Sequence, residues 1–256
     1  MTAPITRDEA FLQFLLRMGD NTLILGHRVS EWCGHAPVLE EDIALANTAL
    51  DLIGQTQMWL GLAGEIEGGK SADDLAFLRD AWDFRNVLMV EVPNGDFGRT
   101  LMRQFLFDAW QSIMLGRLMT SSDDRVAAIA EKASKEVSYH LERSGDTVVG
   151  LGDGTEESHA RMQEALDYLW PYVGEMFASD AVDAEMAAAG IAPDPAGLRE
   201  EYDALVGRVL GEATLTIPES RFAHKGGRDG RMHTEHLGHL LTSMQWLQRA
   251  YPGASW

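Results

Sequence analysis

Two stretches decide the fold: EAFLQFLLRMGDNTLILGHRVSEWC over residues 9–33 and LEEDIALANTALDLIGQTQMWLGLAGEI over residues 39–66. In both, apolar residues return at steps of three and four, which is the period of a helix with a buried face. Gly34-His35-Ala36-Pro37 breaks the pattern between them. The sequence therefore predicts two long helices joined by a short turn, as in neighbouring helices of a bundle.

The same period recurs along the rest of the chain. It predicts two further long helices over residues 97–119 and 123–150, a shorter helix over residues 73–87, and accessory helices after residue 155. No pair of alternating β-branched runs indicates a hairpin. We therefore expect an all-α protein, a four-helix bundle with additional helices that forms one domain over residues 1–256.

Composition and charge limit the function. The 256 residues are 45% hydrophobic and 24% charged, as in an ordinary globular protein. The net charge is −19, from 40 acidic and 21 basic residues. Binding to nucleic acid or to anionic lipid needs Lys and Arg, so we expect neither kind of partner. The acidity leaves room for basic partner subunits.

The single cysteine, Cys33, excludes an internal disulfide and suits a reducing compartment. The N-terminal residues lack the pattern of a signal peptide, and no apolar run reaches the roughly 18 residues of a membrane helix. We therefore expect a cytoplasmic protein. Cys33 and His35 are poorly spaced for a nucleophile and its base, so the sequence favours a buried, inert thiol.

Each predicted long helix carries an acid on a second, polar stripe: Asp20, Asp51, Asp108 and Glu136. In ferritin-like di-iron proteins two helices each supply a Glu, and the other two each supply a Glu-x-x-His. The spacing from Asp20 to Asp51, and that from Asp108 to Glu136, suit equal levels on neighbouring antiparallel helices. A bundle with an internal acidic site of ferritin-like type is thus predicted, with solvent-facing stripes as the alternative.

The histidines of such a site are missing. Gly54 stands three residues after Asp51 and Tyr139 three after Glu136, while His140 lies one step further round the helix. The one Glu-x-x-His, Glu156 to His159, opens a helix, where acids favour the dipole. We therefore predict a degenerate site without metal, in which His27, His140 or a nearby Lys or Arg balances the acids. The positions of this vestigial site are Asp20, Asp51, Gly54, Asp108, Glu136, Tyr139 and His140.

Two further clusters have open interpretations. His233, His236 and His239 lie at steps of three, which spreads them round a helix, so capping or interface roles are favoured over a metal site. The run Asp83-Phe84-Arg85-Asn86 is a candidate nucleotide contact, since Arg pairs with phosphate and Phe stacks on adenine. Its alternative is a partly buried Arg between helices.

Longer runs carry a family resemblance across essentially the whole chain, more loosely over residues 156–212. They are GDN (19–21), EWCGHAP (31–37), DIALAN (42–47), LDLIGQ (50–55), VEVPNG (90–95), RQF (103–105), DAW (108–110), KE (135–136), YHL (139–141), HTEHLG (233–238), MQWLQR (244–249) and the final Trp256. Together they resemble the PaaC-type subunits of phenylacetyl-CoA epoxidases.

The resemblance implies a ferritin-like fold and a place in aerobic phenylacetate degradation, in an NADPH-dependent complex that forms the ring 1,2-epoxide of phenylacetyl-CoA. It implies that di-iron and catalysis belong to a PaaA-type subunit, that a small PaaB-type subunit joins, and that a PaaE-type reductase supplies FAD and iron–sulfur. This chain would then be a structural subunit without its own cofactor. For residues 83–86 it adds that a CoA ester must lie near the heterodimer.

Two other functions stay open at this point. One is a di-iron-type oxygenase subunit that is active in its own right with an unusual metal site. The other is an iron-handling or adaptor helical protein. Iron content, and dependence on a partner subunit, distinguish the three.

Overall fold

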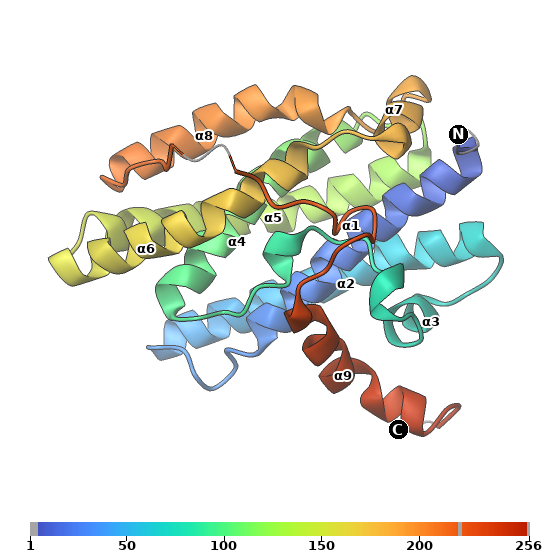
Figure 1. Ribbon diagram of the computed structural model, residues 1–256, viewed down its shortest axis with the longest axis horizontal. Helices are drawn as coiled ribbons and strands as arrows, with labels where there is room; N and C mark the ends of the chain where they lie inside the picture. Colours follow the sequence, from blue (N-terminus) through green and yellow to red (C-terminus); the bar gives the residue numbers. More distant parts are fainter. Residues whose placement is uncertain (1–4, 220–221, 255–256) are drawn as a thin grey trace. The chain divides into compact units, whose positions relative to one another are not determined.

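The computed structural model of the protein describes residues 5–219 and 222–254, so Trp256 lies outside the described residues. All regular secondary structure in these ranges is helical, which confirms the all-α prediction (Figure 1). The chain forms two compact units. Unit 1 comprises Met1–His35, Asp42–Pro93 and Lys225–Trp256, and unit 2 comprises Ala36–Glu41 and Asn94–His224.

Unit 1 is built on an antiparallel pair, α1 (Arg7–Ser30) and α2 (Leu39–Glu67) (Figure 1). α1 begins at a capping box in which Thr6 and Glu9 satisfy each other's backbone amides. Small residues let the helices approach closely, because a Cβ on Gly19 would stand 2.5 Å from the Leu60 side chain. At the centre, the hydroxyls of Thr22 and Thr56 lie 2.8 Å apart.

The rest of unit 1 is formed by shorter elements: α3 (Ala72–Phe77), the 3-10 turns η1 (Ala81–Asp83) and η2 (Leu88–Val90), and α9 (Glu235–Ala250). The predicted helix over residues 73–87 is therefore wrong beyond Phe77. Arg79 turns inward to an ion pair with Asp20, and Asp80 becomes the N-cap of η1. Residues 86–92 are then buried and form only the short turn η2 instead of continuing the helix.

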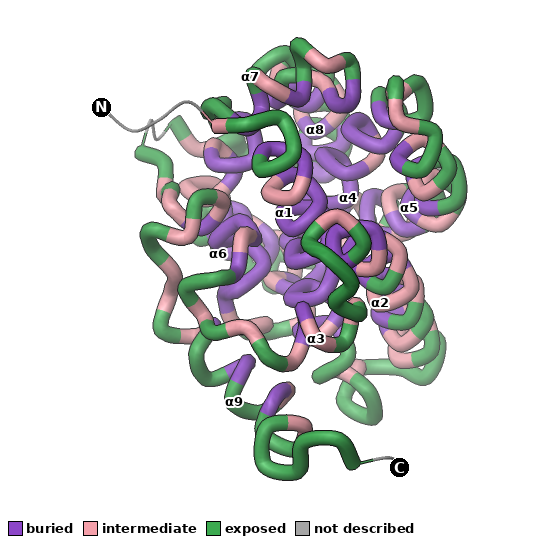
Figure 2. Tube along the Cα trace, turned by 90° about the vertical axis from the view of Figure 1, so that its right-hand side faces the viewer, coloured by how far each residue is buried: buried purple, intermediate pink, exposed green. Residues whose placement is uncertain are grey.

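Unit 2 is built on α4 (Phe97–Leu118) and α5 (Asp124–Gly152), which pack extensively on each other (Figure 1). The stretch 100–111 of α4 is buried throughout (Figure 2). Around this pair lie α6, α7 and α8 with two 3-10 turns. Their bounds are Glu156–Val173 (α6), Gly174–Phe177 (η3), Ala181–Ala188 (α7), Pro195–Leu198 (η4) and Arg199–Glu212 (α8).

The four long helices match the predicted ranges to within three residues at each end. Two such antiparallel pairs are the elements that a ferritin-like fold requires, so this part of the prediction is confirmed. That residues 1–256 act as one domain stays a prediction. No helix within the described residues is long and apolar enough to cross a membrane.

Candidate functional site

Asp20, the first acid of the predicted site, is fully buried in unit 1 and already has strong partners. The Arg79 guanidinium forms a two-pronged ion pair with its carboxylate, with Nη1 3.0 Å from one oxygen. The Arg85 backbone amide donates to the same oxygen at 2.8 Å. Both carboxylate oxygens therefore accept hydrogen bonds from the segment after α3, and the buried charge is balanced by a cation.

Two neighbours on α1 fix the same segment further along. The Asn21 side chain accepts from the Val87 amide at 2.8 Å, and the Arg28 guanidinium donates to the Glu91 carbonyl at 2.7 and 3.2 Å. These contacts satisfy backbone groups that a buried segment without regular structure would otherwise leave unpaired. The buried polar stripe of α1 thus serves to hold residues 79–91 in place.

Glu91 is a second fully buried carboxylate of unit 1, and it joins distant parts of the chain. One oxygen lies 2.6 Å from His233 Nδ1 and accepts from the Asn86 amide at 2.9 Å. The other accepts from the Thr234 backbone amide at 2.7 Å, directly before α9. Glu91 therefore attaches the start of α9 to the buried segment that α1 holds.

The contacts between α1 and α2 show that Asp20 and Asp51 do not share a level. Thr22 faces Thr56, and a Cβ on Gly26 would contact Leu52 and Ile53. The residue of α1 level with Asp51 is therefore His27 or its neighbour, about 10 Å along the axis from Asp20 at 1.5 Å per residue. The expectation drawn from their spacing is wrong, because spacing alone leaves the turn length unknown.

His27, which the sequence offered as a counterion for the acids, faces elsewhere. Its Nδ1 lies 3.8 Å from Glu31, one turn further along α1. Burial lowers the pKa of His27 and so favours the neutral imidazole, while Glu31 opposes that shift. The cation that balances Asp20 is Arg79, in keeping with the nearby Lys or Arg of the hypothesis.

The polar cluster of unit 2 centres on Asp108, which is fully buried on α4. One oxygen accepts from the Gln104 amide at 2.7 Å and the other from the Ser144 hydroxyl of α5 at 2.9 Å. Burial raises the pKa of Asp108 to about 6, against the opposing charge of His140 and these two hydrogen bonds. The carboxyl group therefore titrates within two units of neutral pH.

Glu136 and Tyr139 do not share the level of Asp108. Ser144 faces Asp108, so Glu136 lies eight residues away on α5, roughly 12 Å along its axis. Glu136 is half-buried, and the Tyr139 side chain is 57% exposed. Of the predicted residues on α5, only the buried His140 lies close enough to influence the pKa of Asp108.

The donor atoms that are present do not fit a di-iron centre. Such a centre needs carboxylates and imidazoles that are able to turn toward the metal ions. Both oxygens of Asp20 are engaged by Arg79 and Arg85, and Gly54 offers no side chain. In the described ranges no group of three or more His, Cys, Asp or Glu residues is placed to hold a metal. Loss of the metal site stays a prediction that metal analysis tests.

The predicted CoA-contact run 83–86 is largely engaged within unit 1. Phe84 and Asn86 are fully buried, and only Asp83 is exposed. The Arg85 guanidinium donates to the Gln13 side chain and to two backbone carbonyls of residues 82–84, each at 2.8 Å. These contacts suit the interhelix interpretation of Arg85. That the run contacts CoA stays a prediction.

The structure also shows where the histidine cluster and Cys33 lie. The His233 side chain is covered by its contact with Glu91, whereas His236 is half-buried and His239 exposed, so the three do not converge. Cys33 is exposed, so the expected buried thiol is wrong: the turn after α1 carries it to the surface. His159 of the Glu-x-x-His lies 2.7 Å from the Gly152 carbonyl, at the end of α5, in agreement with a helix-end role.

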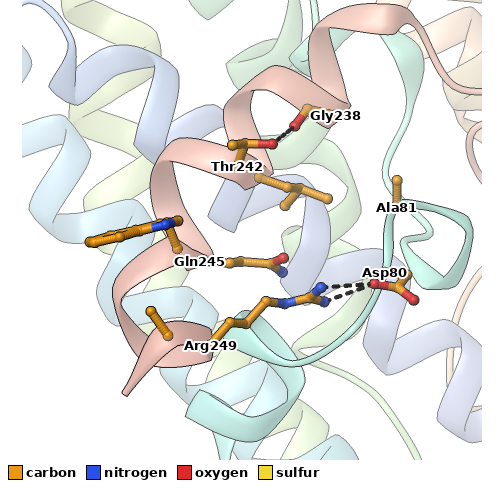
Figure 3. A pocket seen from close by; sticks show the side chains of 9 residues that line it. Asp80, Ala81, Gly238, Thr242, Gln245 and Arg249 are labelled. Carbon is orange, nitrogen blue, oxygen red and sulfur yellow. Dashed lines mark hydrogen bonds and ion pairs between the residues drawn. The ribbon is translucent and has the colours of Figure 1, made fainter. Parts of the chain in front are cut away.

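A groove of about 480 Å³ lies between α9 and the η1 segment (Figure 3). Its walls are mainly apolar, and Trp246 at its side is 60% exposed. Arg249 points across to Asp80, at 2.9 and 3.0 Å, and Thr242 donates to the Gly238 carbonyl (Figure 3). The Gln245 amide donates to the carbonyls of Ala76 and Arg79. These polar groups are engaged within the chain, which leaves few to recognise a small ligand.

Comparison with known proteins agrees with the resemblance in the sequence. Residues 1–256 match the family described as "Phenylacetic acid catabolic protein". The chain belongs to this family. A relative in it from Escherichia coli (strain K12), named as the C subunit of 1,2-phenylacetyl-CoA epoxidase, is 47% identical over 243 residues. These residues are 95% of this chain and 98% of the relative.

In this member of the phenylacetic acid catabolic family, sequence reasoning missed Arg79 and the role of Glu91. One signal was available for Glu91, a lone acid inside the apolar run 87–92, because such an acid is either exposed or bound by several donors. Arg79 offered no signal, because its pairing with Asp20 spans 59 residues and depends on how α3 ends.

Proposed function

We propose that the chain is a non-catalytic structural subunit of a phenylacetyl-CoA 1,2-epoxidase that acts in aerobic phenylacetate degradation. The observation that carries the proposal is 47% identity, over nearly the full length of both chains, to the Escherichia coli relative that is named as a component of that enzyme. In this proposal a PaaA-type subunit holds the di-iron centre and performs catalysis. A small PaaB-type subunit joins the complex, a PaaE-type reductase brings FAD and iron–sulfur, and the assembly is cytoplasmic.

The contacts of the buried acids support a structural role. Asp20 and Glu91 hold backbone segments within unit 1. Asp108 is held between Gln104 and Ser144 in unit 2. Carboxylates used in this way stabilise the fold, and they are poorly placed to release their donors for a metal ion. A rigid subunit of this kind stabilises a partner by binding only the partner's folded form.

The test is co-expression with the PaaA-type subunit of the same organism in iron-rich medium. We expect one complex by size-exclusion chromatography with light scattering. When the two subunits are expressed singly, iron analysis should find iron in the PaaA-type subunit and less than about 0.1 iron per copy of this chain. Phenylacetyl-CoA-dependent NADPH oxidation, with the reductase present, should require the PaaA-type subunit.

Three outcomes contradict the proposal. Failure of the two chains to co-purify would exclude a structural pairing. Near two irons in this chain expressed alone, with substrate-dependent NADPH oxidation in the absence of the PaaA-type subunit, would identify a self-sufficient oxygenase subunit. Iron uptake without such oxidation would indicate an iron-handling protein.

A further inference from the structure

α2 carries apolar residues on an exposed face as well as on its buried face. Its buried side includes Leu45, Leu52 and Trp59, while Ile43 and Leu50 on the opposite side are 53% and 70% exposed. Exposed and half-buried residues recur along α2 (Figure 2). A helix that is apolar all round normally lies buried. The sequence of α2 therefore suits a helix that is covered on its outward face, but no described element covers that face.

The outward residues follow a spacing of three and four along α2. We name them the α2 seam: Ile43, Asn47, Leu50, Gly54, Gln57 and Gly61. Each is exposed or half-buried. Alternating steps of four and three place a stripe on one side of a helix, which is the repeat that two packed helices use.

The described residues do not require glycine at Gly54 and Gly61 of the seam. Gly19 and Gly26 of α1 are needed because a Cβ would meet α2 at 2.5 and 3.2 Å. A Cβ on Gly54 or Gly61 would meet no described atom within 4 Å. Glycine weakens a helix interior relative to alanine, so two outward glycines one heptad apart indicate close approach by something outside the chain.

Charge indicates the nature of that partner. α2 has six acids and no Lys, Arg or His in 29 residues. Glu40, Asp51 and Glu65 follow one edge of the seam by helical position, and Asp42 lies on the other edge. An occupant with basic residues beside its apolar stripe would complement these edges, whereas a second, equally acidic copy of α2 would be repelled.

We propose that the α2 seam is the docking surface for one helix of the catalytic partner subunit, an apolar helix with bulky residues over Gly54 and Gly61 and with Lys or Arg at its edges. This inference rests on the proposed function and adds the surface and the chemistry of contact. The groove at α9 is the competing surface, since Leu78 and Trp82 beside it are 56% and 65% exposed.

Three variants, each co-expressed with the PaaA-type subunit, test the surface. Leu50→Glu places a charge in the centre of the seam and should weaken the complex on the order of 100-fold. Leu78→Glu makes the same change at a comparably exposed leucine away from α2 and should leave affinity within about threefold. Affinity is measured by biolayer interferometry, with folding checked by circular dichroism.

Gly54→Leu separates folding from docking. Because the site is open and leucine is the better helix former, the isolated chain should gain roughly 2–4 °C in Tm. The same side chain blocks close approach and should weaken the complex at least about tenfold. A merely structural glycine would lose stability instead, so the two signs together identify the docking surface.

The outcomes separate this inference from the function it rests on. If the unaltered chain does not bind the PaaA-type subunit, both fail. If the unaltered chain binds and Leu50→Glu and Gly54→Leu bind equally well, only the seam is wrong, and loss of binding in Leu78→Glu would move the surface to the α9 groove. If the isolated chain is a dimer that Leu50→Glu dissociates, a second copy occupies the seam and the proposal is overturned.

Discussion

Asp20 and Glu91 of unit 1 are stabilised differently from Asp108 of unit 2. In unit 1, Asp20 is paired with the Arg79 guanidinium, and Glu91 accepts from three donors, one of them His233. In unit 2, Asp108 accepts from the neutral groups of Gln104 and Ser144, and burial raises its pKa to about 6. Equal burial therefore has different consequences, depending on whether a cation forms a direct ion pair with the carboxylate.

The comparison shows what each acid does for the protein. An ion-paired carboxylate is costly to disturb, because removal of one partner leaves an uncompensated buried charge. A carboxylate held only by neutral donors is itself the destabilising feature when it ionises. Unit 1 should thus depend on Asp20 and Glu91 at neutral pH, whereas unit 2 should tolerate or benefit from neutralising Asp108.

The largest effect is expected at Arg79. Arg79→Met leaves the Asp20 charge buried without its cation and should lower the free energy of unfolding by about 3–5 kcal/mol. Urea denaturation followed by circular dichroism measures it. The double variant Asp20→Asn/Arg79→Met removes both charges and should recover at least half of the loss. A single variant within about 1 kcal/mol of the original chain would contradict the comparison.

Glu91→Gln should lower the free energy of unfolding somewhat less, by about 2–3 kcal/mol. The amide keeps one acceptor oxygen. Its NH₂ group replaces the second carboxylate oxygen and faces the groups that donate hydrogen bonds to that oxygen in the original chain. Glu235→Gln, on the first turn of α9 and exposed, is the matched control and should change stability by less than about 0.5 kcal/mol. Equal losses in both variants would show that burial is irrelevant here.

Asp108→Asn should raise the free energy of unfolding instead of lowering it, by an amount that depends on pH. The raised folded-state pKa means that the folded protein binds a proton more tightly, so the Asp108 contribution to stability is present below about pH 4 and lost as the pH rises through about 6. Relative to the original chain, the variant should gain about 1–2 kcal/mol between pH 4.5 and pH 7.5. A difference that is constant across these pH values would exclude the shifted pKa.

The smallest effect is expected at an exposed ion pair of unit 2. Arg117 and Glu201 form an ion pair at 2.6 Å in unit 2, but their side chains are 57% and 51% exposed. Arg117→Gln should change the free energy of unfolding by less than about 0.5 kcal/mol, because water screens the pair. A loss comparable to that of Arg79→Met would mean that burial does not govern the strength of these pairs.

The long helices were predictable because each carries an apolar stripe over six or more turns between clear breaks. Thr6 with Glu9 and Asp123 before α5 are local capping signals that the structure uses. The segment after Phe77 was not predictable in this way. Its helical pattern loses to contacts made by Asp20, Asn21 and Arg28, which lie about 60 residues earlier in the chain.

The candidate site was predictable in its residues and not in its geometry. That Asp20 and Asp108 are buried follows from their places among apolar residues of the long helices. Register does not follow, since it depends on how Thr22 meets Thr56 and how Asp108 meets Ser144. Those contacts depend on the length of each turn, which the helical period does not determine. For this reason Asp51 and Glu136 were paired wrongly.

The contacts between Glu91 and the start of α9 have a consequence for synthesis of the chain. Its partners His233 and Thr234 lie 142 and 143 residues later in the sequence. At about 5–20 residues per second, a ribosome adds that distance in roughly 7–30 s. Throughout this interval the nascent chain carries a carboxylate whose burial site is incomplete, so α9 has to close a core that α1 began.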